Sequence, residues 1–226
     1  MSSTNQSFIS SNREHFNELA SNYRPSKSSL ELAKRAARAI LKRHAFDGET
    51  TEAMDFACGA GLLSQQFAPH VKSMVGVDIS QGMVDIFNAV VSNQGISPEE
   101  MRAVCMDIQD EGDKLGGQLF DVIVCSMAYH HFESIEHITR TLSTHLKPSG
   151  ALVVVDLLKS EDVDVDSLFP EHQDQIVAHR GGISEKDIEL AFESSGLSKF
   201  ELHPDISVKK NGHDLRIFVA KGVKHT

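Results

Sequence analysis

The sequence has few cysteines and no long apolar run. Its three cysteines, Cys58, Cys105 and Cys125, lie in apolar, strand-like contexts without the spacing of metal ligands. We therefore expect reduced, buried thiols and a cytoplasmic or nuclear location. No apolar stretch is long enough to cross a bilayer, and the first residues lack the apolar core of a secretory signal, so we expect neither a membrane span nor export.

Positive charge is also scarce. Lysine and arginine number 22 against 32 aspartates and glutamates, which gives a net charge of −10. This balance argues against a protein that holds nucleic acid non-specifically. A hydrophobic content of 40% in 226 residues suits one α/β domain with a full core and leaves little room for a second.

The stretch from Glu52 to Ser80 organises the rest of the chain. An apolar run over 52–57 predicts a buried strand, and a turn containing Gly59 and Gly61 follows it. Helical spacing follows over 62–67, and a second predicted strand over 74–77 leads into Asp78. This is the layout of a nucleotide-binding βαβ unit, in which glycines admit the ligand, the helix start favours an anion and the acid binds ribose hydroxyls.

The glycine turn departs from the dinucleotide fingerprint, because Ser64 stands where its third glycine would be. An ordinary glycine turn in another α/β protein is one interpretation. The D-x-x-C-G-x-G form that begins at Asp55 resembles motif I of the class I S-adenosylmethionine-dependent methyltransferases, which usually have glycine in place of Ala57. The runs VGVDIS, FDVIV and LKPSG follow in the family's order, and the nearest resemblance is to the ubiquinone/menaquinone-type small-molecule enzymes.

Periodicity and the resemblance together predict a doubly wound, Rossmann-like α/β fold with a seven-stranded, mostly parallel sheet and an antiparallel last strand. Residues 1–46 would form a cover, with disorder over 1–12 and helices over 13–20 and 28–46. Residues 47–226 would form the cofactor-binding domain, with a lid-like insert at 159–183. Further helices are expected over 80–92, 135–146 and 184–195, and further strands over 102–106, 120–125, 151–158, 199–206 and 213–220.

The resemblance implies S-adenosylmethionine as cofactor and in-line transfer of its methyl group to a small-molecule acceptor, at oxygen, nitrogen, sulfur or carbon. Alternative roles are helix packing for Tyr23, core packing for Met83 and a solvated strand end for Asp107. The resemblance implies the following cofactor contacts: Tyr23, Asp55, Ala57, Cys58, Gly59, Gly61, Asp78, Ile79, Met83, Asp107, Ile108, Ser126 and Met127.

A general base is needed only if the acceptor loses a proton early. His130 and His131 follow the strand over 120–125, and His179 lies in the insert, so these three are the candidates. Neighbouring histidines point in different directions, and we expect at most one of the pair to be catalytic. Some quinone-pathway enzymes bind a metal through carboxylates in this loop, but the corresponding places here hold Met127 and His130, so no metal is expected.

Three other functions can be compared with the pattern. A nucleotide-dependent oxidoreductase would need the missing third glycine and a nicotinamide pocket. A non-catalytic binding module, acting as a scaffold or regulator, would not need Gly59, Gly61 and Asp78 all intact. A nucleic-acid aminomethyltransferase would carry a proline pair after the fourth strand, where this chain reads SMAY. We therefore expect a small-molecule acceptor and no nucleic-acid partner.

Overall fold

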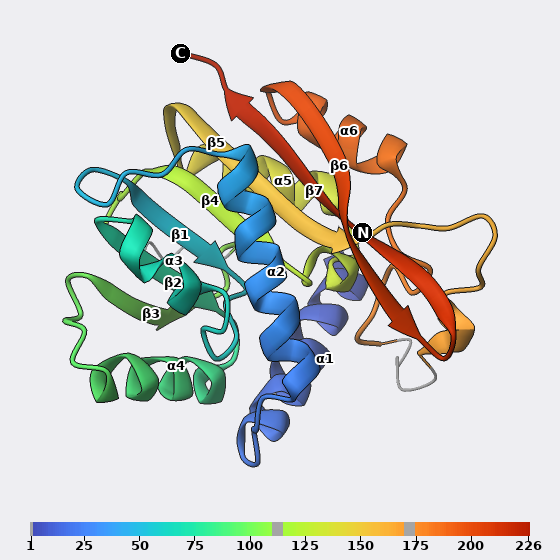
Figure 1. Ribbon diagram of the computed structural model, residues 1–226, viewed down its shortest axis with the longest axis horizontal. Coiled ribbons are helices and arrows are strands. Elements are labelled where there is room, and N and C mark those ends of the chain that lie inside the picture. Colours follow the sequence, from blue (N-terminus) through green and yellow to red (C-terminus); the bar gives the residue numbers. More distant parts are fainter. Residues whose placement is uncertain (1, 110–114, 170–174) are drawn as a thin grey trace.

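A computed structural model describes residues 2–109, 115–169 and 175–226 (Figure 1). Helices and strands alternate along most of the chain, as a doubly wound α/β domain requires. The helices are α1 (Ser2–Ala20), α2 (Lys27–Arg43), α3 (Ser64–Phe67), α4 (Gln81–Asn93), α5 (Ile135–Thr144) and α6 (Glu185–Ser194), and the strands are β1 (Glu52–Phe56), β2 (Ser73–Asp78), β3 (Met101–Cys105), β4 (Phe120–Ser126), β5 (Leu146–Leu157), β6 (Leu197–Lys210) and β7 (His213–Lys224).

The strands form one seven-stranded sheet in the order β3-β2-β1-β4-β5-β7-β6. β1 pairs in parallel with β2 and β4, so that Met54 lies between Val75 and Ile123. The last strand, β7, runs antiparallel to both of its neighbours, β5 and β6. The predicted fold class, with a mostly parallel sheet and an antiparallel last strand, is confirmed.

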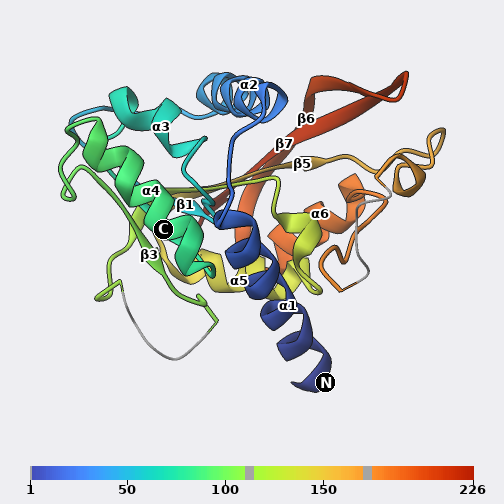
Figure 2. The ribbon, with the colours of Figure 1, turned by 90° about the horizontal axis from the view of Figure 1, so that it is seen from below.

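Helices cover both faces of the sheet, which explains why its central strands are continuous apolar runs. In Figure 2, α2 and α3 lie on one side of the strands and α5 and α6 on the other. The four residues from Val122 to Cys125 in β4 are fully buried between these layers. None of the helices in the described ranges is long and apolar enough to cross a membrane.

Serine side chains fix where several helices begin. Ser80 accepts a hydrogen bond from the backbone N–H of Met83 at the start of α4, and Ser184 accepts one from Asp187 at the start of α6. Both starts were expected from the sequence, because a serine before an apolar periodic run satisfies one of the free N–H groups of the first turn. These two helix starts can therefore be predicted from the neighbouring sequence.

The expected disorder of residues 1–12 is wrong for residues 2–12, because α1 begins at Ser2. Long-range contacts hold this segment in place: Asn12 is buried, and its Nδ2 donates to the carbonyl of Ile176. The helix expected from residue 62 begins only at Ser64 and is four residues long. So short a helix lacks the aligned peptide dipoles that would favour an anion, and the loop itself must provide the contacts.

Helix α1 lies over the carboxyl edge of the sheet, where it is held against the start of α4. The Asn17 side-chain oxygen accepts hydrogen bonds from the Ser80 hydroxyl at 2.9 Å and from the Gly82 N–H at 3.0 Å. A Cβ on Gly82 would lie 2.7 Å from the Cβ of Ala20, so only glycine permits this close approach. Helix α1 therefore covers the carboxyl ends of the strands.

The two glycines after β1, Gly59 and Gly61, have different structural roles. Both have positive φ, +51° at Gly59 and +81° at Gly61, a region that other residues enter at a cost. A Cβ on Gly61 would lie 2.6 Å from the ring of Phe87, whereas a Cβ on Gly59 would meet nothing within 4 Å. Gly61 therefore serves core packing, and Gly59 keeps the space beside the loop open.

We expect Gly61→Ala to lower the free energy of unfolding by about 3 kcal/mol, since overpacking and a left-handed backbone each cost about 1–3 kcal/mol. Gly59→Ala is the matched control, because it introduces the backbone strain without the clash and should cost about 1 kcal/mol. Urea unfolding of both variants measures the two losses. Equal losses would show that Phe87 does not restrict residue 61.

Candidate active site

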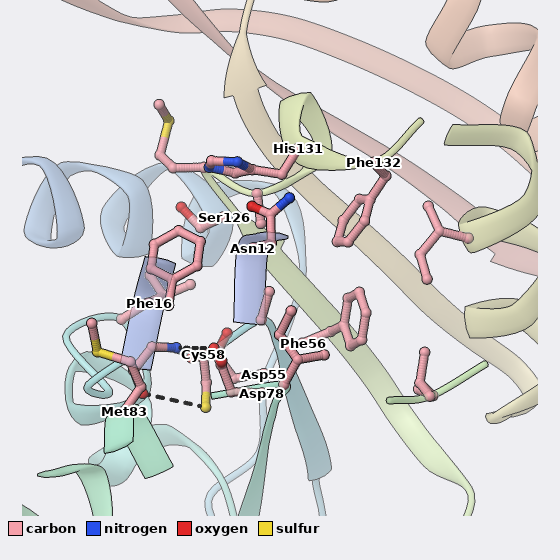
Figure 3. Close-up of a pocket in the computed structure, with 18 of the residues that line it drawn as sticks. Asn12, Phe16, Asp55, Phe56, Cys58, Asp78, Met83, Ser126, His131 and Phe132 are labelled. Atoms are coloured by element: carbon pink, nitrogen blue, oxygen red, sulfur yellow. Dashed lines mark hydrogen bonds between the residues drawn. The ribbon is translucent and has the colours of Figure 1, made fainter. Parts of the chain in front are cut away.

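A cavity of about 340 Å³ lies at the carboxyl ends of the parallel strands, beneath α1 (Figure 3). The ends of β1, β2 and β4 form its floor, and α1 and the loop after β4 form its walls. Open α/β sheets bind their ligands at this edge. Most of the cavity surface is apolar, and the polar groups that reach it are few and specifically placed.

Asp78, at the end of β2, ties the glycine loop to the sheet. One of its carboxylate oxygens accepts the N–H of Gly59 at 2.8 Å, and the other accepts the N–H of Ser80 at 2.9 Å. Asp78 is only 8% exposed, and burial raises the pKa of its carboxyl, while these backbone hydrogen bonds oppose the rise. The chain thus holds a buried carboxylate at the cavity floor.

Ser64 explains the missing third glycine. Its hydroxyl donates a hydrogen bond to the carboxylate of Asp55, near the carboxyl end of β1. Asp55 is almost fully buried, and this burial raises its pKa to about 7; the Ser64 bond opposes the rise and the charge of Asp78 adds to it. Glycine could not provide this hydroxyl, so the departure from the fingerprint satisfies a buried acid.

Two non-glycine residues at the cavity adopt left-handed backbone conformations. Ala57, after β1, has φ of +56°, and Met127, after β4, has φ of +54°. Such angles turn the chain sharply at the strand ends and favour glycine. Ala57 stands where the resembled family usually has glycine, and its φ shows why glycine suits that position.

Four residues expected to contact the cofactor lie near the ends of β2 and β3. Ile79, Met83, Asp107 and Ile108 all line the cavity, and Met83 and Ile108 are buried. One oxygen of Asp107 accepts the N–H of Gln109 at 3.0 Å, and the other lies 4.0 Å from the guanidinium of Arg13. Apolar walls beside a carboxylate and a backbone N–H are suited to a flat, polar-edged ring.

The cavity brings together nearly every residue expected to contact a cofactor. Gly61 is not among the lining residues, since it packs against Phe87. Tyr23 lines the cavity from the turn after α1, and burial raises the pKa of its hydroxyl. The expected residues that line it are Tyr23, Asp55, Ala57, Cys58, Gly59, Asp78, Ile79, Met83, Asp107, Ile108, Ser126 and Met127.

The three candidate histidines have separate places. His130 is not among the lining residues: its Nδ1 lies 2.8 Å from a carboxylate oxygen of Asp156, whose second oxygen accepts the His130 backbone N–H. His179 also lies outside the lining; its Nε2 is 3.0 Å from the Phe132 carbonyl and its N–H donates to the His130 carbonyl. Both histidines therefore hold the shape of the loop after β4.

His131 lines the cavity, in the short 3₁₀ helix Tyr129–His131. Its Nδ1 lies 2.8 Å from the carbonyl oxygen of Ile176. A carbonyl can only accept, so Nδ1 carries a proton, and in the neutral ring Nε2 carries the lone pair. Of the three candidates, His131 is the one whose ring reaches the cavity.

The sequence reasoning missed the residues that α1 contributes. Phe8, Asn12 and Phe16 line the cavity from three successive turns of one helix face. Their spacing of four residues is the periodic signal that could have found them. It also missed Asp156 as the partner of His130, because the two residues are 26 positions apart.

Possible metal ligands are dispersed in the described part of the chain. Over residues 2–109, 115–169 and 175–226, no three histidine, cysteine or acidic side chains are grouped so as to hold an ion. Two carboxylates at the cavity instead accept hydrogen bonds from the chain itself: Asp55 from the Ser64 hydroxyl, and Asp78 from backbone N–H groups. The site is arranged around hydrogen bonds.

A glycine loop, a strand-end acid and a cavity covered by α1 are arranged here as in nucleotide-binding α/β domains. The family model described as "Methyltransferase domain" matches residues 29–202, so the chain belongs to this family. An uncharacterized methyltransferase of Schizosaccharomyces pombe is 40% identical over 153 residues, 66% of this chain and 54% of that protein. A ubiquinone biosynthesis O-methyltransferase of Rickettsia felis is 22% identical over 114 residues, 50% and 44%. The chain spans about half the length of these relatives.

Solved structures share the fold at low identity. The magnesium protoporphyrin IX methyltransferase of Synechocystis PCC 6803, with bound SAH, aligns over 96% of this chain and 99% of that chain, with a TM-score of 0.69 and 14% identity. The YcgJ protein of Bacillus subtilis aligns over 84% and 99%, with a TM-score of 0.65 and 18% identity. The resemblance to class I methyltransferases is thereby confirmed.

The His130–Asp156 pair makes stability depend on pH. Asp156 raises the pKa of His130, although burial opposes the rise; conversely, His130 and backbone N–H groups hold the pKa of Asp156 low despite burial. A raised histidine pKa stabilises the fold below about pH 6.5, and this contribution is lost as the pH rises through the folded-state pKa. A lowered aspartate pKa stabilises it above about pH 4, and this is lost as the pH falls through the folded-state pKa.

We expect the free energy of unfolding of the wild type to exceed that of the double variant His130→Gln/Asp156→Asn most between about pH 4 and 6.5. The excess should shrink on both sides of this window, as measured by urea unfolding from pH 3.5 to 9. Tyr129→Phe is the control, because it removes a buried hydroxyl that bonds Thr139 and should give a loss independent of pH in this range. A pH-independent excess would contradict the ion pair.

Proposed function

We propose that the protein transfers a methyl group from S-adenosylmethionine to a small-molecule acceptor. The observation that carries the proposal is the position of Asp78: its buried carboxylate faces the cavity while it holds the glycine loop through Gly59. Membership of the methyltransferase-domain family and the fold of neighbours solved with SAH support it.

The residues fit this cofactor. Each carboxylate oxygen of Asp78 accepts one backbone N–H and has a further lone pair, so the two oxygens can accept the two ribose hydroxyls. Such donors would compensate a carboxylate that is nearly removed from water. Asp107 and the N–H of Ile108 would read the edge of adenine, with Ile79 and Met83 as its apolar walls.

The amino-acid end would lie between the ends of β1 and β4. We assign Ala57 and Cys58 to the loop that encloses it and Ser126 and Met127 to the opposite wall. Asp55, whose pKa of about 7 permits ionisation near neutrality, would face its ammonium group. Gly61 would support the loop from behind, and Tyr23 would close over the cofactor from the end of α1.

S-adenosylmethionine supplies a methyl group on a sulfonium, and the electrons of the broken S–C bond remain on sulfur in S-adenosylhomocysteine. The chain's own contribution is then to position the acceptor in line and to exclude water. The apolar lining contributed by Phe16 and Phe132 suits both tasks.

We assign the role of general base to His131, since its Nε2 lone pair belongs to a ring that lines the cavity. An acceptor proton that passes to Nε2 leaves an imidazolium. His130 and His179 are assigned as positioning residues, because their ring nitrogens lie against Asp156 and the Phe132 carbonyl.

We further propose that residues 1–46 act as the cover and residues 47–226 as the cofactor-binding domain. Helix α1 supports the first assignment, because it supplies one wall of the cavity. The 159–183 insert would act as a lid through its end near Ile176, which contacts both α1 and His131. Cys58, Cys105 and Cys125 carry thiols rather than disulfides, which favours a reducing compartment such as the cytoplasm.

We expect titration calorimetry to show binding of S-adenosylhomocysteine and no binding of NAD. The cavity offers a strand-end acid for ribose, but the third glycine of the dinucleotide loop is replaced by Ser64. Binding of NAD alone would indicate the oxidoreductase instead. Transfer of a labelled methyl group into a small-molecule fraction of cell extract should follow; tight binding without transfer to any fraction would indicate a non-catalytic module.

We expect His131→Asn to lower the rate of labelled-methyl transfer by about 10²–10⁴-fold and to leave affinity for S-adenosylhomocysteine within about twofold, since a general base acts on the acceptor alone. Rates are measured at saturating S-adenosylmethionine, with calorimetry on the same preparation. His70→Asn, at an exposed turn after α3, is the control. An unchanged rate in His131→Asn, or parallel loss of affinity, would refute the assignment.

A further inference from the structure

Asn12 carries a buried polar atom that the fold leaves without a partner. The residue is only 6% exposed and lines the cavity from α1. Among the described residues, its Oδ1 is the one buried side-chain nitrogen or oxygen atom that has no hydrogen-bond partner. A buried acceptor without a donor destabilises the fold, so its presence in a cavity wall points to a ligand.

The orientation of the Asn12 amide is determined by its neighbours. Its Nδ2 donates to the carbonyl of Phe8 at 3.0 Å and to the carbonyl of Ile176 at 3.1 Å. Rotating the amide by 180° would place its oxygen against two carbonyl oxygens, none of which can donate. Oδ1 is therefore the atom that stays available.

The same carbonyl of Ile176 also orients His131. It accepts from Asn12 Nδ2 and from His131 Nδ1, at 3.1 and 2.8 Å, and so uses both of its lone pairs. This shared carbonyl brings the Asn12 amide and the His131 ring together. The Asn12 oxygen and the Nε2 of a neutral His131 are both acceptors, so neither can donate to the other.

Aromatic rings surround these two acceptors. Phe8, Phe16 and Phe132 line the same cavity, and Phe16 packs edge-on against His131 at 5.4 Å between ring centres. In Figure 3, Asn12 lies toward His131 and Phe132, whereas Asp78 lies toward Met83. The acceptor pair thus belongs to the apolar part of the cavity, away from the acid assigned to ribose.

From this arrangement we infer that the methyl acceptor is an uncharged, ring-bearing apolar molecule whose hydroxyl donates to Asn12 Oδ1 or His131 Nε2. The inference rests on the proposed function and adds the substrate class and Asn12 as the residue that selects it. Two acceptors require a donor on the ligand, and an apolar wall disfavours a charged one. A hydroxyl satisfies Oδ1 in the bound state and can pass its proton to His131 during transfer.

The test compares hydroxylated rings with their methyl ethers, which have nearly the same shape but no donor. Phenol and anisole form one pair, and 2-naphthol and 2-methoxynaphthalene form the other. Each is titrated into the full chain saturated with S-adenosylhomocysteine. We expect the hydroxyl compound of at least one pair to bind about tenfold or more tighter than its ether, as one hydrogen bond of about 1.4 kcal/mol would produce.

Asn12→Leu should abolish most of that preference and keep the affinity for S-adenosylhomocysteine. The Ile176 carbonyl retains the His131 donor in this variant, so the wall stays supported. Asn22→Leu is the matched control: this exposed residue just after the same helix donates to the Ser21 hydroxyl and does not line the cavity, so the preference should persist. Thermal unfolding checks that each variant is folded.

Equal binding of hydroxyl and ether by the wild type, or binding of neither pair, would overturn the inference without need of a variant. A loss of S-adenosylhomocysteine affinity in folded Asn12→Leu would also overturn it, since the amide would then serve the cofactor. If the wild type bound no S-adenosylhomocysteine, the proposed function would fail. If it bound that molecule but did not distinguish the pairs, only this inference would fail.

Discussion

The hydrogen bond from the Gly59 N–H to Asp78 connects the parts of this site. It joins the loop after β1 to the end of β2, and the other oxygen of Asp78 accepts the N–H of Ser80. The Ser80 hydroxyl in turn donates to Asn17, which holds α1 over the strand ends. One buried carboxylate therefore positions the floor, the start of α4 and, through Ser80, the roof. A buried acid must be satisfied by donors, and this requirement fixes the geometry.

A second network shapes the opposite side. Asp156 at the end of β5 binds both the ring and the backbone N–H of His130, while the carbonyl of Ile176 receives Asn12 and His131. The two networks meet at α1, which contributes Asn17 to the first and Asn12 to the second. Because α1 belongs to both, a change in its seating would alter the cofactor side and the acceptor side together.

Local signals predicted most of the fold and of the cofactor side. The strands were readable from apolar runs, the α4 start from Ser80, and the cavity floor from Gly59 and Asp78, whose roles depend on backbone close by. The acceptor side was not readable, because its contacts join distant positions: Asn12 and Ile176 are 164 residues apart. The polar, serine-rich start was interpreted as disordered for the same reason, since it is held by long-range contacts such as the Asn12–Ile176 hydrogen bond. Ser64 looked like a defect in a glycine motif until its partner Asp55 was known.

Central to the proposed function is that the Asp78 carboxylate accepts hydrogen bonds from both ribose hydroxyls. The most direct measurement is the affinity of the wild type for 5′-methylthioadenosine and for its 2′,3′-dideoxy analogue, by titration calorimetry. Two hydrogen bonds to a buried carboxylate are worth about 3 kcal/mol or more, so the account predicts binding weaker by on the order of a hundredfold for the dideoxy compound. Equal affinities for the two compounds would contradict it.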